Sequence, residues 1–260
     1  MIKKFLEQSW LYFKGDFIMF NFYEFLMLEV MNPFLTLILY CMVAAYSFHT
    51  KNLADWVIGN SFLLCVTNCI YAAGLSFNQE RRFGRIRTII ISPYSKAAII
   101  FEKGFFRSLI SAVTVLCGFF LASTIFSVDY SNVNMILFIL NVIVAMYSTM
   151  GFGMLLGVIG LITDQIDMIL NLSVNILILM SGANFPLSQL PYIVQTISYC
   201  LPLTHSISAA SMLFYAFEMK DFIQQLTIEV LIGSLFYFVS FVLIKKIEKI
   251  AIKNSTLEIF

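Results

Sequence analysis

Long apolar runs separated by short charged segments constrain this chain more than any other feature of its sequence. About 20 consecutive apolar residues cross the hydrocarbon core of a bilayer as a helix. Hydrophobic residues make up 60% of the chain and charged residues only 12%, whereas about a quarter of the residues in a soluble domain are charged. The sequence therefore predicts an all-α integral membrane protein.

The charged stretch at residues 78–107 organises the predicted topology. A segment this basic cannot lie in hydrocarbon, and an excess of Lys and Arg marks the cytoplasmic side of a membrane protein. It is either a topology anchor alone or a docking surface for a soluble cytoplasmic partner. It holds seven of the sixteen Lys and Arg residues, namely Arg81, Arg82, Arg85, Arg87, Lys96, Lys103 and Arg107.

Six membrane spans are predicted on the two sides of this stretch, at about residues 25–48, 54–77, 105–126, 135–162, 168–185 and 228–244. With both termini cytoplasmic, fourteen of the sixteen Lys and Arg residues lie inside, and only Lys51 and Lys220 lie outside. Residues 186–217 are apolar, but Pro191 and Pro202 divide them into pieces too short to cross. We expect these pieces to form re-entrant or extracellular interfacial helices.

The chain divides into three predicted regions. Residues 1–23 carry apolar side chains at three- and four-residue spacing, which is typical of an amphipathic helix in the cytoplasmic interface. Residues 24–244 form the six-span transmembrane domain, with a charged cytoplasmic segment at 78–104 and the re-entrant helices at 186–217. Residues 245–260 form a Lys-rich cytoplasmic tail.

Motifs for catalysis are absent from the sequence. It has no G-x-x-x-x-G-K-[ST] loop for ATP phosphates and neither G-x-S-x-G nor H-E-x-x-H. Two His and five scattered Cys favour neither a metal centre nor a disulfide framework. The ionisable residues that border the spans are expected near span ends, which disfavours transport driven by an ion gradient. They are Glu29, Glu102, Arg107 and Glu229.

Neutral polar residues are predicted inside the membrane, where lipid cannot satisfy their hydrogen bonds. They either bond neighbouring helices or form a weakly polar lining for an amphipathic substrate, and both interpretations stay open. The candidates for a translocation path are Asn68, Tyr71, Asn141, Asn171, Asn175 and Ser181. Gly153 and Gly157 form a G-x-x-x-G pair, which predicts a close helix contact.

Several motifs occur in a specific order along the chain. After the second span come Glu80-Arg81-Arg82-Phe83-Gly84-Arg85-Ile86-Arg87, Ser92-Pro93 and Lys103, and after the fifth come Ser181-Gly182, Phe185-Pro186, Leu190-Pro191 and Leu201-Pro202-Leu203-Thr204-His205. This order resembles the permease subunit of ABC-2 type exporters. That family often has an Arg shortly after the last motif. In this chain Ala209, Ala210 and Ser211 occupy that region. The resemblance therefore implies no functional charged residue there.

The resemblance implies separate ABC ATPase subunits, which bind ATP and Mg, and a second permease subunit in a homodimer or heterodimer. It implies that residues 78–104, between the second and third spans, are a coupling segment that includes a coupling helix for the ATPase. The coupling residues would be Glu80, Arg81, Arg82, Gly84, Arg85, Arg87, Ser92 and Pro93. Asp164 and Asp167 either add a minor contact or form a solvated turn. The resemblance also implies a re-entrant gate at Pro186, Pro191, Pro202, Thr204 and His205.

The expected function is export of an amphipathic cargo, such as an antibiotic or other drug, a peptide or a lipid-like molecule, across a bacterial plasma membrane. Multidrug resistance is one such role. A polysaccharide or lipid-linked glycan exporter is the alternative within the family, although Glu24 and Glu29 stand where such exporters are usually more basic. The rival of a different class is an ion-coupled carrier or a membrane enzyme without an ATPase. Membrane lipid is an expected partner and nucleic acid is not.

Overall fold

The computed structural model of the chain is a helical bundle, and the residues that it describes contain no β-strand. These residues are 2–19, 23, 27, 31–48, 53–82, 84, 88, 92, 94–130, 133–161, 163, 165–215 and 217–253. For 2, 16–19, 48, 65, 81 and 248–253 only the backbone is described. The helical fold class predicted from the sequence is confirmed for this part of the chain.

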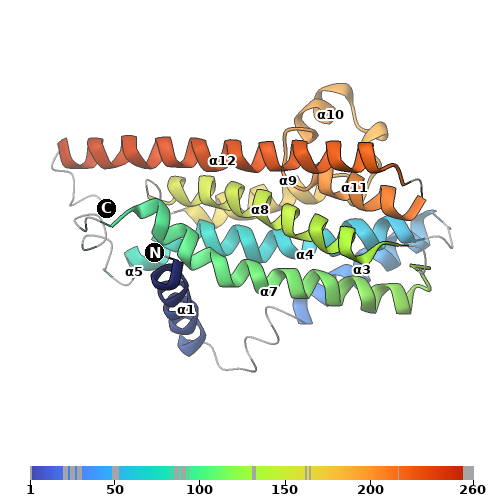
Figure 1. The fold of residues 1–260 in the computed structure, drawn as a ribbon, viewed down its shortest axis with the longest axis horizontal. Helices are drawn as coiled ribbons and strands as arrows, with labels where there is room; N and C mark the ends of the chain where they lie inside the picture. The colour runs from blue at the N-terminus through green and yellow to red at the C-terminus, as the bar shows by residue number, and fades with distance from the viewer. Residues whose placement is uncertain are drawn as a thin grey trace.

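Helix α4 (Ala54–Gly74) lies at the centre of the bundle. It packs against α7 (Lys96–Ile125), α8 (Met135–Ile159), α3 (Asn32–Phe48) and α9 (Ile166–Met180), as Figure 1 shows. Its most apolar window is 88% buried within this single chain. Helix α12 (Met219–Lys253) packs along α8 on the outside of the bundle, and only 22% of its corresponding window is buried.

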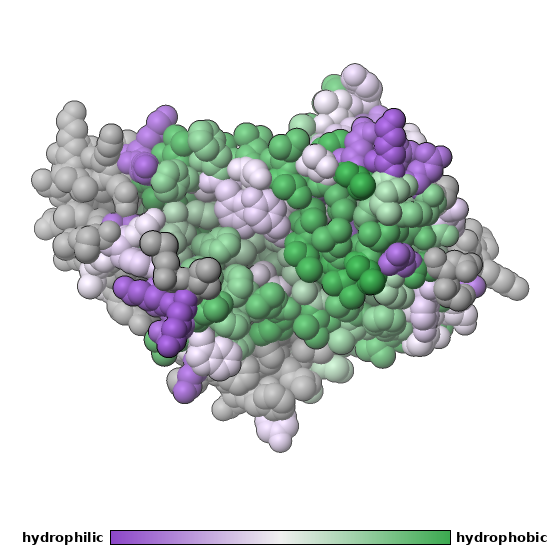
Figure 2. Space-filling model, viewed as in Figure 1, coloured by the Kyte–Doolittle hydropathy of each residue, from purple (hydrophilic) through white to green (hydrophobic). Residues whose placement is uncertain are grey.

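Four described helices are long and apolar enough to cross a membrane, namely α4, α7, α8 and residues 219–247 of α12. The predicted first and fifth spans appear as the shorter apolar helices α3 and α9. Figure 2 shows an apolar band along the bundle with hydrophilic atoms gathered toward its two ends. The chain is therefore a multi-pass membrane protein, whereas the number of six spans stays a prediction.

Two helix boundaries differ clearly from those predicted. Helix α7 begins at Lys96 and not near Phe105, so part of the predicted coupling segment belongs to a long helix. The sequence pattern hides this start because Lys96 and Lys103 look too polar for a span. The ammonium of Lys96 binds the carbonyl of Ser92 at 2.8 Å, which compensates its burial. Helix α12 begins at Met219, before the predicted residue 228.

Helix α1 (Ile2–Met19) runs across one end of the bundle, roughly perpendicular to the long helices in Figure 1. Its apolar side packs on α7 through aromatic pairs. The ring of Phe5 lies 5.6 Å from Phe101 and 5.3 Å from Phe105, and Trp10 lies 5.4 Å from Phe106. The predicted helix is present, and its location in the membrane interface stays a prediction.

The proline-divided segment forms three short elements between α9 and α12. They are η2 (Leu187–Gln189), α10 (Tyr192–Ser198) and α11 (Thr204–Tyr215). Pro191 precedes the first residue of α10, a position where a fixed backbone angle and a missing N–H are tolerated. Each piece is shorter than a membrane span, as the sequence predicts. In Figure 1, α11 lies beside the start of α12 and α10 projects from the bundle.

Glycines on α8 allow its backbone to approach α4 closely. A Cβ on Gly157 would lie 2.6 Å from the carbonyl oxygen of Ala73, and one on Gly153 would lie 3.0 Å from the Cα of Ile70. Contacts this short to backbone atoms leave no room for a larger side chain. The close-packing face predicted from the G-x-x-x-G pair is confirmed.

Substituting Gly157→Ala should destabilise the protein, because its methyl group would force α8 away from the carbonyl of Ala73. We expect a loss of about 1–3 kcal/mol, the range typical of overpacked sites. Thermal unfolding of the purified protein in detergent measures it. Gly15→Ala is the matched control, because a Cβ there has no neighbour within 4 Å. Equal melting temperatures for Gly157→Ala and wild type would contradict the close contact.

Candidate translocation path and coupling surface

A buried ion pair organises the end of the bundle that is predicted to be cytoplasmic. Helix α5 (Ser76–Arg82) continues from α4 after a turn at Leu75. The ammonium of Lys103, on α7, lies 2.5 Å from the carboxylate of Glu80, and both side chains are buried. Lys103 also donates to the carbonyl of Ser76 at 3.1 Å. This geometry fixes α5 against α7, so Glu80 binds within the chain.

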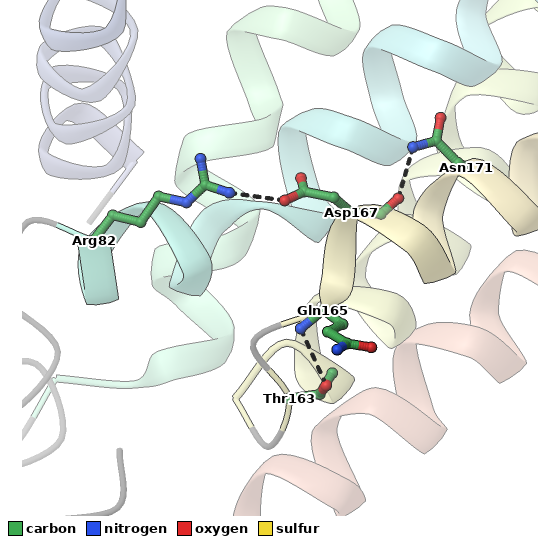
Figure 3. Close-up of polar contacts among 5 residues, drawn as sticks. All are labelled: Arg82, Thr163, Gln165, Asp167 and Asn171. Atoms are coloured by element: carbon green, nitrogen blue, oxygen red, sulfur yellow. Dashed lines mark hydrogen bonds and ion pairs between the residues drawn. The ribbon is translucent and has the colours of Figure 1, made fainter.

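A second ion pair joins the two predicted cytoplasmic segments. Arg82 lies 2.8 Å from the carboxylate of Asp167, at the start of α9, as Figure 3 shows. The backbone carbonyl of Asp167 accepts a bond from the amide of Asn171, whose side-chain oxygen accepts from Tyr71 on α4 at 2.5 Å. The side chains of Arg82 and Asp167 are 67% and 48% exposed, so this pair adds little stability. It nevertheless brings Arg82 and Asp167 onto one accessible surface.

The other predicted coupling residues are placed only in part. Gly84 follows α5 with a φ of 68°, a left-handed conformation that glycine adopts without strain. The hydroxyl of Ser92 accepts from the backbone N–H of Tyr94 at 3.2 Å, which shapes the turn before α7. Glu80 through Arg82 lie in α5, with Arg81 described by its backbone alone. Arg85, Arg87, Pro93 and Asp164 lie outside the described residues.

Tyr94 connects the interface helix to α7. Its hydroxyl lies 3.0 Å from the side chain of Gln8 on α1 and donates to the carboxylate of Glu102 on α7. The bond to Glu102, together with burial, raises the pKa of Tyr94 to about 12. The phenol, protonated at neutral pH, bonds to Glu102 on α7 and contacts Gln8 on α1, so it links α1 to the start of α7.

A polar pocket of about 140 Å³ lies over α4 between α3 and α9, and we call it the inner pocket. Polar groups alternate with aliphatic ones in its wall, and the side-chain nitrogen of Asn68 is buried there with no partner among the described residues. Such a wall suits an amphipathic molecule. The pocket is lined by Asn32, Pro33, Thr36, Leu37, Tyr40, Asn60, Leu63, Leu64, Thr67, Asn68, Val174 and Ile178.

A second cavity, of about 380 Å³, lies at the first turn of α4, and we call it the outer cavity. Residues 181–187 and α11 form its other walls. The hydroxyl of Ser181 is fully buried in it without a partner among the described residues. The cavity is lined by Asp55, Trp56, Ser181, Gly182, Ala183, Asn184, Phe185, Pro186, Leu187, Ile207, Ser208 and Ser211.

A pair of amides separates the inner pocket from the outer cavity. Asn60 lines the former and Asn184 the latter, and the amide nitrogen of Asn60 donates to the side-chain oxygen of Asn184 at 3.1 Å. The indole of Trp56 donates to the carbonyl of Asn184 at 3.2 Å. Beside them a Cβ on Gly59 would lie 2.6 Å from the backbone of Ala183. The two spaces are therefore closed off from each other in this conformation.

The residues predicted for the path lie at several different places. Asn68 lines the inner pocket and Ser181 the outer cavity, whereas Tyr71 bonds to Asn171 near the start of α9. Asn171 and Asn175 lie on the exposed side of α9. Asn141, on α8, donates to the carbonyl of Ser206 at 2.8 Å, so it connects helices away from both cavities.

Glu229 was expected near the end of the last span; its depth in the membrane stays a prediction, but the sequence did not indicate its burial inside the bundle. Helix α12 begins ten residues earlier, at Met219, and the side chain of Glu229 is 0% exposed. Its carboxylate accepts from the hydroxyl of Ser148, near the middle of α8, and from the backbone N–H of Leu203 at 2.8 Å. In the sequence, Glu229 is the first polar residue of the predicted last apolar run. A polar residue in that position looks the same as one that marks the boundary of a span.

The predicted gate residues lie around the start of α11. Pro202 and Thr204 are buried, and the ring of His205 lies 2.6 Å from the side chain of Gln225 and 3.1 Å from the carbonyl of Tyr199. Pro186 lines the outer cavity, and Pro191 begins α10 on the exposed side. These contacts suit a positioning role for His205. Within the described residues no cluster of metal-binding side chains occurs.

These features define a helical membrane protein with two cavities beside its central helix and a charged surface at one end. The profile of the ABC-2 type transporter family matches residues 7–215. The chain belongs to this family, which confirms the resemblance drawn from its motifs.

Two bacterial permeases are similar in sequence to part of the chain. The chain is 25% identical over 161 residues to the inner membrane transport permease YhhJ of Escherichia coli K12, and equally to the protein of that name from Shigella flexneri. The match covers 61% of this chain and 41% of each relative. The chain thus spans less than half the length of these relatives.

Replacing Lys103 with Ala should destabilise the protein strongly, by about 3–5 kcal/mol, because it removes one charge of a buried pair. Thermal unfolding in detergent measures this loss. The double variant Lys103→Gln with Glu80→Gln should be less damaging than the sum of its single variants, since neither charge remains. Additive losses in this double-mutant cycle would show that the two residues do not interact.

Proposed function

We propose that the chain is the permease subunit of an ATP-driven exporter that moves an amphipathic molecule along the path beside α4. One observation carries the proposal: the inner pocket and the outer cavity follow each other along α4 and are closed from each other by the Asn60–Asn184 bond. Two successive spaces with one closure between them are what alternating access requires.

The energy source in this proposal is a separate ABC ATPase, which would bind ATP and Mg. Its docking surface would be centred on Arg82, Gly84, Arg85 and Arg87, with Asp167 beside Arg82. Exposed charges of both signs fix the register of such an interface more than they add affinity. Glu80 is assigned an internal role, because its carboxylate is buried against Lys103.

A second permease subunit is the proposed neighbour of α3 and α9. The exposed side of α9 carries Asn175 among large apolar residues, and lipid cannot satisfy an amide. The inner pocket opens between these two helices, so a partner on this face would complete its wall. A homodimer and a heterodimer both fit this proposal.

ATP-driven closure of two ATPase subunits would draw the cytoplasmic segments together. Because α5 continues from α4 and Arg82 reaches α9, a force on this surface would act directly on two of the three helices that line the inner pocket. The resulting tilt would break the Asn60–Asn184 bond and open the outer cavity, a shift between two packed states powered by nucleotide.

The proposed cargo is an uncharged or weakly charged amphipathic molecule, such as a drug, a peptide or a lipid-like compound. The inner pocket offers three Asn, two Thr and a Tyr beside aliphatic side chains, and none of its lining residues is ionisable apart from Tyr40. The name of the bacterial relatives supports an inner-membrane location.

An ion-coupled carrier would need a titratable residue deep in the membrane, and the candidate is Glu229, which is buried against the middle of α8. Both of its oxygens, however, accept hydrogen bonds from donors on other elements. The carboxylate is therefore held in one position as a hydrogen-bond acceptor. The ATP-driven exporter remains the function that the geometry supports best.

Reversing the charge at the coupling surface should remove the ATPase from the purified complex. We expect Arg82→Glu with Arg87→Glu to lower the recovered ATPase at least about tenfold, since like charges facing each other across an interface cost several kcal/mol. Affinity purification in mild detergent, with mass spectrometry and an ATPase assay, measures it. Lys220→Glu is the matched control, because Lys220 is exposed at the opposite end of α12. A wild-type protein that purifies with no ATPase would overturn the proposed function.

Removing the amide bond between the two spaces should open the path. In the variant Asn60→Ala, we expect faster reaction of a cysteine at Thr67, in the inner pocket, with a membrane-impermeant maleimide added outside the cell. The control is Thr227→Val, a polar substitution on the exposed side of α12. An unchanged labelling rate in Asn60→Ala would show that this bond does not close the path.

A further inference from the structure

Glu229 binds the start of α11 with both of its carboxylate oxygens. One oxygen accepts from the hydroxyl of Ser148, on α8, and from the backbone N–H of Leu203 at 2.8 Å. The other accepts from the backbone N–H of Ser206 at 3.3 Å. One fully buried side chain of α12 therefore connects three helices at a single point.

A carboxylate suits this position better than any other side chain. Ionised Glu accepts at both oxygens, and all three of its partners here are N–H or O–H donors. Gln has the same shape, but its NH₂ group would face an N–H or O–H donor, which leaves buried groups unsatisfied. Leu203 adopts a φ of 75°, an uncommon conformation for a residue with a side chain, and the bond to Glu229 holds its N–H.

Further contacts bind α11 to the same pair of helices. Gln225 lies one turn before Glu229 on α12 and meets the ring of His205 at 2.6 Å. From α8, Asn141 donates to the carbonyl of Ser206. The start of α11 is thus attached to α8 and α12 by side chains on both.

Residues 181–187 form the opposite wall of the outer cavity, and their side-chain bonds go to other helices. Asn184 is held by Trp56 and Asn60, which both belong to α4. The cavity lies between this wall and the residues Ile207, Ser208 and Ser211 of α11. The residues around Asn184 are consequently bonded to α4 and, through the carbonyl of Ile178, to α9. The start of α11 is bonded to α8 and α12, whereas Tyr215 at its end bonds to Asp55 of α4.

We propose that Glu229 is a positioning residue that makes α11 move together with α8 and α12, so that the outer cavity opens along the boundary between α11 and residues 181–187. The inference rests on the proposed function, and it adds how the gate is attached to the rest of the bundle. Without the carboxylate, movement of α8 and α12 would no longer be transmitted to α11.

The test measures the opening of the cavity directly and needs no knowledge of the cargo. A single cysteine replaces Ser208 in a background whose native cysteines are serine, because Cys200 is exposed. The complex with its ATPase is reconstituted, and the labelling rate with a membrane-impermeant maleimide is compared with and without ATP and vanadate. We expect nucleotide to change the rate when Glu229 is present. In Glu229→Gln this change should be lost while ATP hydrolysis continues.

Two further variants keep the test decisive. Glu218→Gln changes the same residue type at an exposed position just before α12 and should retain the full nucleotide effect. Ser148→Ala removes one donor to Glu229 without touching its charge, and it should lose part of the effect.

A full nucleotide effect in Glu229→Gln would overturn the proposal. So would loss of ATP hydrolysis together with the effect, because that would indicate a general folding role. If Glu229→Gln does not assemble, a full effect in Ser148→Ala would reject the proposal, and a partial effect would support it. Failure of the wild type to purify with an ATPase is a separate result, which concerns the proposed function.

Discussion

The close packing of other elements around α4 is the constraint on which the rest of the structure depends. Backbone approaches backbone at both ends of this helix, at Gly59 against Ala183 and at Ala73 against Gly157. In a membrane no hydrophobic effect drives helices together, so such contacts and buried hydrogen bonds must supply the association. The central helix thereby becomes a rigid wall that both the inner pocket and the outer cavity share.

Buried polar groups then decide which elements belong together. Every amide or carboxylate that leaves water needs a partner inside the protein, because lipid provides none. The side-chain oxygen of Asn184 accepts from Asn60 on α4. The backbone N–H groups of Leu203 and Ser206 donate to Glu229 on α12. The segment between α9 and α12 is thus shared between two parts of the bundle.

The cytoplasmic charges show both the strength and the limit of sequence reasoning. The basic stretch was recognised from its composition, and its order of motifs identified the family. Its internal geometry could not be predicted, because Glu80 and Lys103 are 23 residues apart and their pairing depends on how α5 folds back on α7. Arg82 and Asp167 are further apart still, and nothing local to either indicates that they meet.

Hydropathy and charge alone determined that this chain is a helical membrane protein, where its apolar helices lie and why Pro191 and Pro202 interrupt the last apolar stretch. These properties follow from residues close in sequence, since burial in lipid and helix breaking are local effects. Only the tertiary structure decided that Asn68 and Ser181 line cavities, that Asn141 joins helices and that Glu229 is buried. Each of these depends on which faces of distant helices meet, and a neutral or acidic side chain in an apolar run carries no signal of its eventual partner.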